Sequence, residues 1–250
     1  MNTKTLRQIA AKSLGLLALP FALGLSFTLA GSHPAIAGDD HGRGSLRGQA
    51  HPPGNLYSAY QAKWWQWATS LPADHNPLLD TADGGAGQAG PVWYLCGVFG
   101  SAPAERTLTV PAGKSLFFPV LNLAYFLTDA TDTVEGSREL INLVMDHVVY
   151  EETFAEIDGR RVAHLERYRS DSPLFDVGPL PENNLLGIDA GSVIPTVDDG
   201  IYLLLRPLPP GEHTIRFGGR VFVPAGVLGD DPWENIQDVT YHITVAPRRR

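Results

Sequence analysis

The C-terminal part of the chain alternates apolar and polar side chains with a period of two residues. Within residues 238–245, Val239, Tyr241, Ile243 and Val245 are apolar, and the positions between them are polar. Successive side chains of a β-strand point to opposite faces, so this pattern predicts a strand with one buried face. A helix would need apolar positions three and four residues apart, and this segment is therefore restricted to a sheet.

Several other segments have the length and apolar character of strands. Asp158-Gly159 separates two alternating segments, which is typical of a hairpin turn. The 26 glycines and 20 prolines are spread along the chain, as expected when turns join many short strands. The sequence predicts strands at 92–99, 106–110, 115–121, 153–157, 160–164, 200–207 and 213–218, and mostly loop at 72–91 and 170–196.

Two segments have helical spacing instead. In residues 56–70, Tyr57, Tyr60, Trp64 and Trp67 recur three or four residues apart and would share one face of a helix, with Asn55 as its cap. Residues 136–150 carry a broad apolar stripe. With only two helices and many strands, the sequence predicts a mainly β protein, an antiparallel β-sandwich or jelly roll with two accessory helices. We expect a single domain over residues 55–246.

The N-terminal segment has the features of an export signal. Three cations precede an apolar stretch at 14–30, and Ala35-Ile36-Ala37 provides the small side chains that signal peptidase requires. We predict a signal peptide over residues 1–37, cleaved after Ala37, with Ala30 as the alternative site. A retained anchor is the other interpretation, but Pro20 interrupts a stretch already shorter than the roughly 20 residues of a spanning helix.

Export would leave a periplasmic or extracellular protein with no transmembrane segment. It would begin with a flexible polar leader at 38–54 and end in a disordered basic tail at 247–250. Removing the three cations of residues 1–37 leaves 16 basic and 27 acidic residues, a net charge of −11. This acidity argues against a nucleic-acid partner, which would need a basic patch.

Cys96 is the one cysteine of the chain, so no disulfide forms within it. It lies in the strand-like segment 92–99, where a buried, inert thiol is the simplest interpretation. An intermolecular disulfide and a nucleophile are the alternatives, although no histidine lies near Cys96 in sequence.

Several segments together resemble an uncharacterised group of bacterial exported proteins. They are the tryptophan-rich segment 64–67, Val110-Pro111-Ala112-Gly113-Lys114 followed by Phe117-Phe118-Pro119, and Leu208-Pro209-Pro210-Gly211-Glu212-His213-Thr214-Ile215. The similarity extends over most of the chain after the signal. It implies export and a β-sandwich, and it assigns no activity.

Aromatic residues are the first candidate site. Exposed aromatic rings stack on sugars while nearby polar groups bind the hydroxyls. We therefore consider a ligand-binding module for an envelope or extracellular polysaccharide, with Trp65 as the residue most exposed. The alternative is that these rings only pack a helix onto the sandwich. The candidate residues are Trp64, Trp65, Trp67, Trp93, Tyr94 and Gln88.

An acidic, glycine-rich loop is the second candidate. Asp74, Asp80 and Asp83 could offer the oxygen ligands that calcium prefers, although their spacing matches no known calcium loop. The alternative is ordinary turn and cap aspartates. Asp198-Asp199 and Asp230-Asp231 are similar acidic pairs that give a weaker indication of calcium. Calcium is the one cofactor considered.

Catalytic patterns are absent from the sequence. The histidines have no metal-ligand spacing, although His213 and His242 could meet on neighbouring strands. No nucleophile elbow or phosphate-binding loop occurs. Three hypotheses follow: a non-enzymatic ligand-binding module, a carboxylate-dependent hydrolase or lyase, and a structural or assembly protein of the envelope.

Overall fold

The computed structural model describes residues 55–80 and 84–247, so the signal peptide, the leader and Asp83 lie outside the described residues. Its helices are α2 (Asn55–Thr69) and α3 (Val134–Met145), with short 3-10 turns η2 (Ala73–His75), η3 (Pro77–Leu79) and η4 (Leu165–Tyr168). Its strands are β1 (Val92–Tyr94), β2 (Ala102–Pro111), β3 (Ser115–Phe126), β4 (Val148–Ile157), β5 (Arg160–Arg161), β6 (Arg169–Asp171), β7 (Phe175–Val177), β8 (Ile194–Leu205), β9 (Gly211–Val223) and β10 (Trp233–Ala246).

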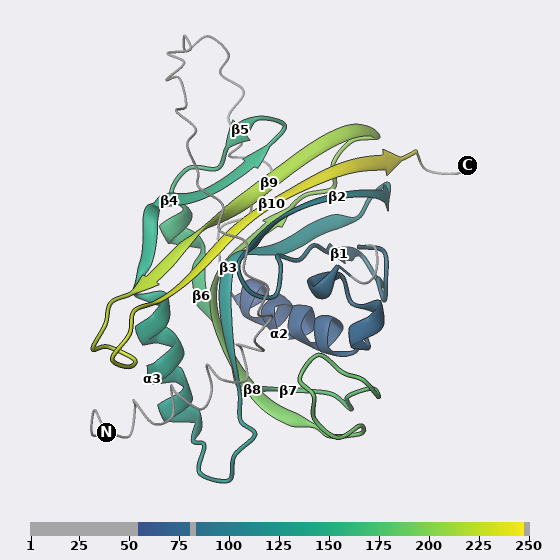
Figure 1. The fold of residues 1–250 in the computed structure, drawn as a ribbon. Helices are drawn as coiled ribbons and strands as arrows, with labels where there is room; N and C mark the ends of the chain where they lie inside the picture. Colours follow the sequence, from purple (N-terminus) through teal and green to yellow (C-terminus); the bar gives the residue numbers. More distant parts are fainter. Residues whose placement is uncertain (1–54, 81–83, 248–250) are drawn as a thin grey trace.

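The strands form two five-stranded sheets (Figure 1). The first sheet has the order β1-β3-β8-β6, with β7 also paired to β8, and the second has the order β2-β10-β9-β4-β5. The predicted β-sandwich with two accessory helices is confirmed. Most pairs are antiparallel, but β1 pairs with β3 and β2 pairs with β10 in parallel, so both sheets are mixed.

Two apolar cores hold the layers together. The first lies between the sheets and includes the buried face of α3, while the second lies between the outer face of the first sheet and α2. The first sheet is therefore covered on both faces. In β10, residues 237, 239, 241, 243 and 245 are buried and alternate with more exposed neighbours, as the period of two predicted. Burying each large apolar side chain contributes about 1.5–3 kcal/mol.

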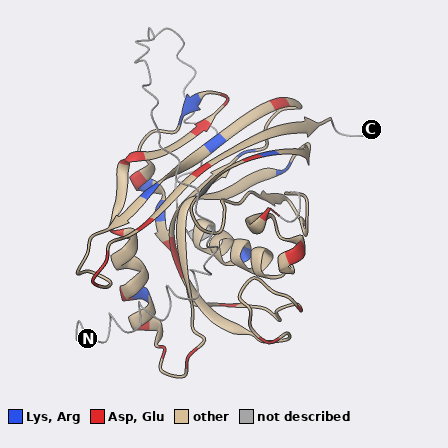
Figure 2. Cartoon of the chain, viewed as in Figure 1, with Lys and Arg blue, Asp and Glu red and all other residues tan. Residues whose placement is uncertain are grey.

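The outer face of the second sheet is polar and carries charged residues of both signs (Figure 2). Arg216 of β9 pairs with Asp238 of β10, and Arg220 pairs with Glu234 and Glu152. These exposed ion pairs each contribute at most about 1 kcal/mol. They show that basic residues on this face alternate with acidic partners.

Local turn chemistry fixes the hairpin between β4 and β5. Asp158 and Gly159 both have positive φ, 51° and 72°, as a two-residue hairpin turn of type I′ requires. The predicted helix at 136–150 is too long, because α3 ends at Met145 and β4 begins at Val148. Val148 and Val149 instead pair with β9. Among the described residues, no helix combines the length and apolar character needed to span a bilayer.

Candidate functional site: a cavity along the edge of β3

The three clustered tryptophans lie in the second core, not on the surface. Trp64 is 1 % exposed, and Trp65 and Trp67 are each 6 % exposed. The expectation that Trp65 is the exposed residue is wrong. The reason is that α2 packs against β3, β7 and β8 of the first sheet and also against the segment after β7, which supplies Leu180 and Leu185 to the same core. A helix covered on two sides buries residues outside its main apolar stripe.

The other residues predicted for ligand binding bind the protein itself. The ring of Tyr94 stacks on Trp67 with 5.6 Å between centroids, and Trp93 is half-buried against the first core. The Gln88 amide accepts from the Tyr94 N–H at 2.9 Å and donates to the Tyr94 carbonyl at 2.7 Å. Gln88 thus takes the place of a neighbouring strand beside β1.

The aspartates predicted to bind calcium do not converge in the described residues. Asp74 is exposed in η2, Asp83 is outside the described residues, and Asp80 forms an ion pair with Arg106 at 2.7 Å. Across residues 55–80 and 84–247, no group of three or more histidine, cysteine, aspartate or glutamate side chains is arranged to hold a metal ion. His213 and His242 bind Asp158 and Glu105 respectively. The calcium site stays a prediction.

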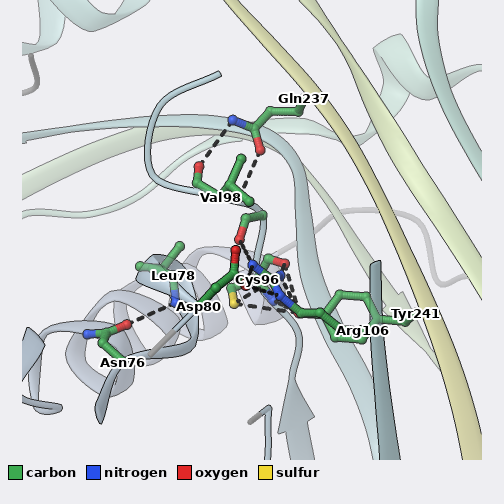
Figure 3. A network of polar contacts seen from close by, with 9 residues as sticks. Asn76, Leu78, Asp80, Cys96, Val98, Arg106, Gln237 and Tyr241 are labelled. Atoms are coloured by element: carbon green, nitrogen blue, oxygen red, sulfur yellow. Dashed lines mark hydrogen bonds and ion pairs between the residues drawn. The ribbon is translucent and has the colours of Figure 1, made fainter. Parts of the chain in front are cut away.

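Arg106 anchors the segment that follows β1 to the second sheet (Figure 3). Its guanidinium donates to the Cys96 carbonyl at 2.7 Å, the Gly97 carbonyl at 3.1 Å and the Tyr241 hydroxyl at 2.8 Å. Cys96 is fully buried and its thiol is free. Burial raises the pKa of the Cys96 thiol, although the Arg106 charge opposes the rise. The thiol is therefore held neutral, which fits the inert interpretation.

A cavity of about 310 Å³ lies between the two sheets and α2. Its lining includes every residue of two segments, 97–101 and 119–124. Side chains of an extended strand alternate between faces, so six consecutive β3 residues can line one cavity only if it lies along the edge of the strand. Trp64 and Trp65 also line it, as do Val144 and Met145 of α3, and most of the lining is apolar.

Gln237 holds the wall of the cavity opposite β3. Its Oε1 accepts from the Val98 N–H at 3.0 Å, and its Nε2 donates to the Val98 carbonyl at 3.1 Å (Figure 3). The Nε2 also donates to the Gly100 carbonyl at 2.6 Å. Gly97 permits this approach, because a Cβ there would lie 2.6 Å from Gln237 Oε1. The exposed lining residues Gly100, Ser101 and Glu234 place the mouth of the cavity at this end.

A buried carboxyl group lies directly behind the cavity. Asp198 is fully buried in β8, where its Oδ1 accepts from Trp65 Nε1 at 2.7 Å. The Tyr202 hydroxyl donates to both carboxyl oxygens, at 3.0 and 2.9 Å, and itself accepts from Asn122 Nδ2 at 2.9 Å. Burial raises the pKa of Asp198 to about 8, while the hydrogen bonds from Trp65 and Tyr202 limit the rise. Trp65 and Asn122 also line the cavity and so connect it to this carboxyl group.

Asp198 and Asp199 lie within a strand and do not converge on a common site. β8 begins at Ile194 instead of residue 200, and the two carboxyl groups point to opposite sides of the strand. Asp199 faces Arg169, whose guanidinium contacts it at 2.6 Å and also reaches Asp146 at 2.7 Å. Burial raises the pKa of Asp199, but the three hydrogen bonds from Arg169 favour its ionised form.

The geometry suits binding better than acid–base chemistry. Of the acidic residues, only Glu234 lines the cavity in the part of the chain that the structure describes, and its carboxylate is paired with Arg220. The hydrolase hypothesis would need two carboxylates facing each other across a groove. The volume is about twice that of an engineered apolar cavity of about 150 Å³ that binds benzene.

Comparison with known proteins adds no family. No family model matches the chain, and no curated protein matches it. Among solved structures, the chain is similar to a chain in the structure described as "Structure of PbICP-C in complex with falcipain-2". The two share 9 % identity with a TM-score of 0.23, over 63 % of this chain and 100 % of the other. A similarity this low supports no conclusion about fold or function.

Proposed function

We propose that this protein is exported and binds a small, largely apolar ligand in the cavity along β3. The observation that carries the proposal is the cavity itself, which is apolar in most of its lining and open at residues 100–101. Binding sites for small molecules are typically concave and apolar, with a few polar groups that orient the ligand. The amide side chains in the lining are Asn122, Asn235 and Gln237, which also form hydrogen bonds within the protein.

Export rests on the sequence of residues 1–37, which carries the charge, apolar stretch and small residues of a signal peptide. Mass spectrometry of the protein recovered outside the cytoplasm tests this part of the proposal. The expected N-terminus is Gly38, and a chain retained in the cytoplasm with residues 1–37 intact would contradict it.

A bound polysaccharide receives less support than before. The hypothesis depended on an exposed aromatic platform, whereas Trp64, Trp65 and Trp67 are buried. Two of these rings still line the cavity. The proposal therefore keeps these aromatic residues as ligand contacts and replaces the sugar by a smaller, more apolar molecule.

Thermal melting of the purified protein tests the proposal. A ligand at about a hundred times its dissociation constant stabilises the folded state by about 2.7 kcal/mol. For a domain of this size that corresponds to a rise in Tm of about 5–10 °C. The panel contains small aromatic and alicyclic probes, soluble polysaccharide fragments, and calcium with a chelator control. A rise with apolar probes supports the proposal. A rise only with glycans or only with calcium overturns it, as does no rise at all.

A pair of valine variants locates the binding. Val144 lines the cavity and is 3 % exposed, so Val144→Phe should fill the cavity and abolish the rise in Tm while the fold is retained. Val148 is 8 % exposed in the same core but does not line the cavity. Val148→Phe should lose about 1–3 kcal/mol from overpacking and still bind the probe.

A further inference from the structure

The first sheet has an unpaired edge where the cavity lies along β3. β1 pairs with β3 only over residues 115–117, and no other described strand continues on that side. Residues 119–124 of β3, which follow the segment paired with β1, line the cavity. The cavity is therefore a slot in which the next strand of the sheet is missing.

The direction of the backbone groups follows from the pairing with β8. The Leu127 N–H donates to the Pro195 carbonyl, which places residue 127 among those that hydrogen-bond to the β8 side. Alternate residues of an antiparallel pair bond on the same side, so Asn122 and Ala124 direct their N–H and C=O groups to the cavity. Asn122 is paired with Gly200 of β8, and a Cβ added to Gly200 would lie 2.6 Å from Asn122 Cβ. Side chains come this close in antiparallel pairs that do not share backbone hydrogen bonds, so this contact agrees with the assignment.

Neighbouring backbone groups are capped in a different way. The amide of Gln88 takes both hydrogen bonds of Tyr94, and the amide of Gln237 takes both of Val98. Within residues 55–80 and 84–247, no side chain forms such a cap on Asn122 or Ala124. The slot therefore presents donors and acceptors in the alternating order that a peptide group complements.

Both faces of the slot are apolar. Trp64 and Trp65 lie on the α2 side of β3, while Val144, Met145 and Val221 lie on the side of the first core. Side chains of an added strand would point alternately to these two sides. The slot thus offers apolar surroundings to consecutive residues of an extended peptide.

We infer that the cavity binds a short extended peptide with apolar side chains, which adds to the free edge of β3 as one more strand. Such addition obtains affinity from main-chain hydrogen bonds and specificity from alternate side-chain pockets. The volume of about 310 Å³ favours a free peptide of two or three residues over a segment of a folded partner. This inference rests on the proposed function and names the class of its ligand.

Three matched probes separate the two proposals. The probes are N-acetyl-leucyl-valine amide, its analogue with an ester in place of the central amide, and naphthalene. If the inference holds, the dipeptide binds at least tenfold more tightly than the ester analogue, which has lost one main-chain donor. Equal affinity for all three overturns the peptide inference but keeps the apolar cavity. If none of the three probes binds, both proposals are overturned.

Two further measurements place the peptide on β3. In a ¹H–¹⁵N correlation spectrum the amides of Asn122 and Ala124 should shift most on addition of the dipeptide, and shifts confined to other strands would refute the placement. Ala124→Pro removes one N–H on the cavity side without taking a bond to β8, at an edge where Pro119 is already accepted. It should weaken dipeptide binding at least tenfold, and weaken it more than it weakens naphthalene binding. If this variant fails to fold, the amide shifts still decide the matter.

Discussion

Replacing Asp198 by asparagine should change how the free energy of unfolding depends on pH. The side chain is fully buried, and its pKa in the folded protein is about 8 against an ordinary value of 3.8. Asparagine has nearly the same shape and can still accept hydrogen bonds from Trp65 and Tyr202, but it does not titrate. The variant therefore isolates the contribution of one proton.

The sign of the effect follows from which state holds that proton. Between about pH 4 and pH 8 the unfolded chain has lost it while the folded protein keeps it, so the stability of the wild type falls as the pH rises. The full window of about four pH units corresponds to at most about 6 kcal/mol, at about 1.4 kcal/mol per unit. Between pH 5 and pH 8, we expect the wild type to lose up to about 4 kcal/mol relative to Asp198→Asn.

Urea unfolding followed by tryptophan fluorescence at pH 5, 6, 7 and 8 measures this difference. Asp230→Asn, at an exposed position, is the matched control, and its free energy of unfolding should change with pH as that of the wild type does. If the free energy of unfolding of Asp198→Asn changes with pH as that of the wild type does, at a lower stability, the carboxyl group is ionised in the folded protein. In that case the donors Trp65 and Tyr202 outweigh the cost of burial, and the reasoning is refuted.

Three further changes test the contacts around the cavity. Arg106→Met should lower the free energy of unfolding by about 2–4 kcal/mol, because three acceptors, two of them on buried residues, lose a donor. Urea unfolding should show a loss of less than about 1 kcal/mol for the exposed control Arg216→Met. A loss no larger than that of the control would contradict the anchoring role. Gln237→Leu should accelerate hydrogen exchange at the Val98 amide by at least tenfold. Unchanged exchange would show that segment 97–101 keeps its position without the hydrogen bonds from Gln237. Gly159→Ala should lower the free energy of unfolding by about 1 kcal/mol in the same assay. The cause is the positive φ alone, because no atom lies within 4 Å of the added Cβ. No loss would mean that the turn relaxes to another conformation.

Local patterns explain why much of the fold could be predicted. The alternation around Tyr241 and the turn at Asp158 act over a few residues, and both were read correctly from the sequence. The end of α3 could not be predicted in this way, because Val148 continues the helical spacing of Val144 and valine also favours a strand. Pairing with Val221 of β9 decides the outcome, and that partner is remote in sequence.

The candidate site depended on contacts that sequence reasoning could not supply. Asp198 has the sequence signature of a turn residue, and its burial depends on Trp65, which lies 133 residues away. The run of apolar residues that follows Gly200 was the one available signal that the strand could begin earlier. The cavity left no signal, because a missing strand is a property of how β1 and β3 pair and not of any motif.

The position of Arg106 also bears on solubility. β2 is an outer strand of the second sheet, paired only with β10 among the described residues, and such strands are templates for aggregation. Arg106 points inward from β2, in line with the buried Leu108 and Val110. An inward-pointing charge is one of the features that natural sheets use to discourage pairing with a second molecule at an edge. We therefore expect the residue that anchors Cys96 also to oppose pairing of two molecules through β2.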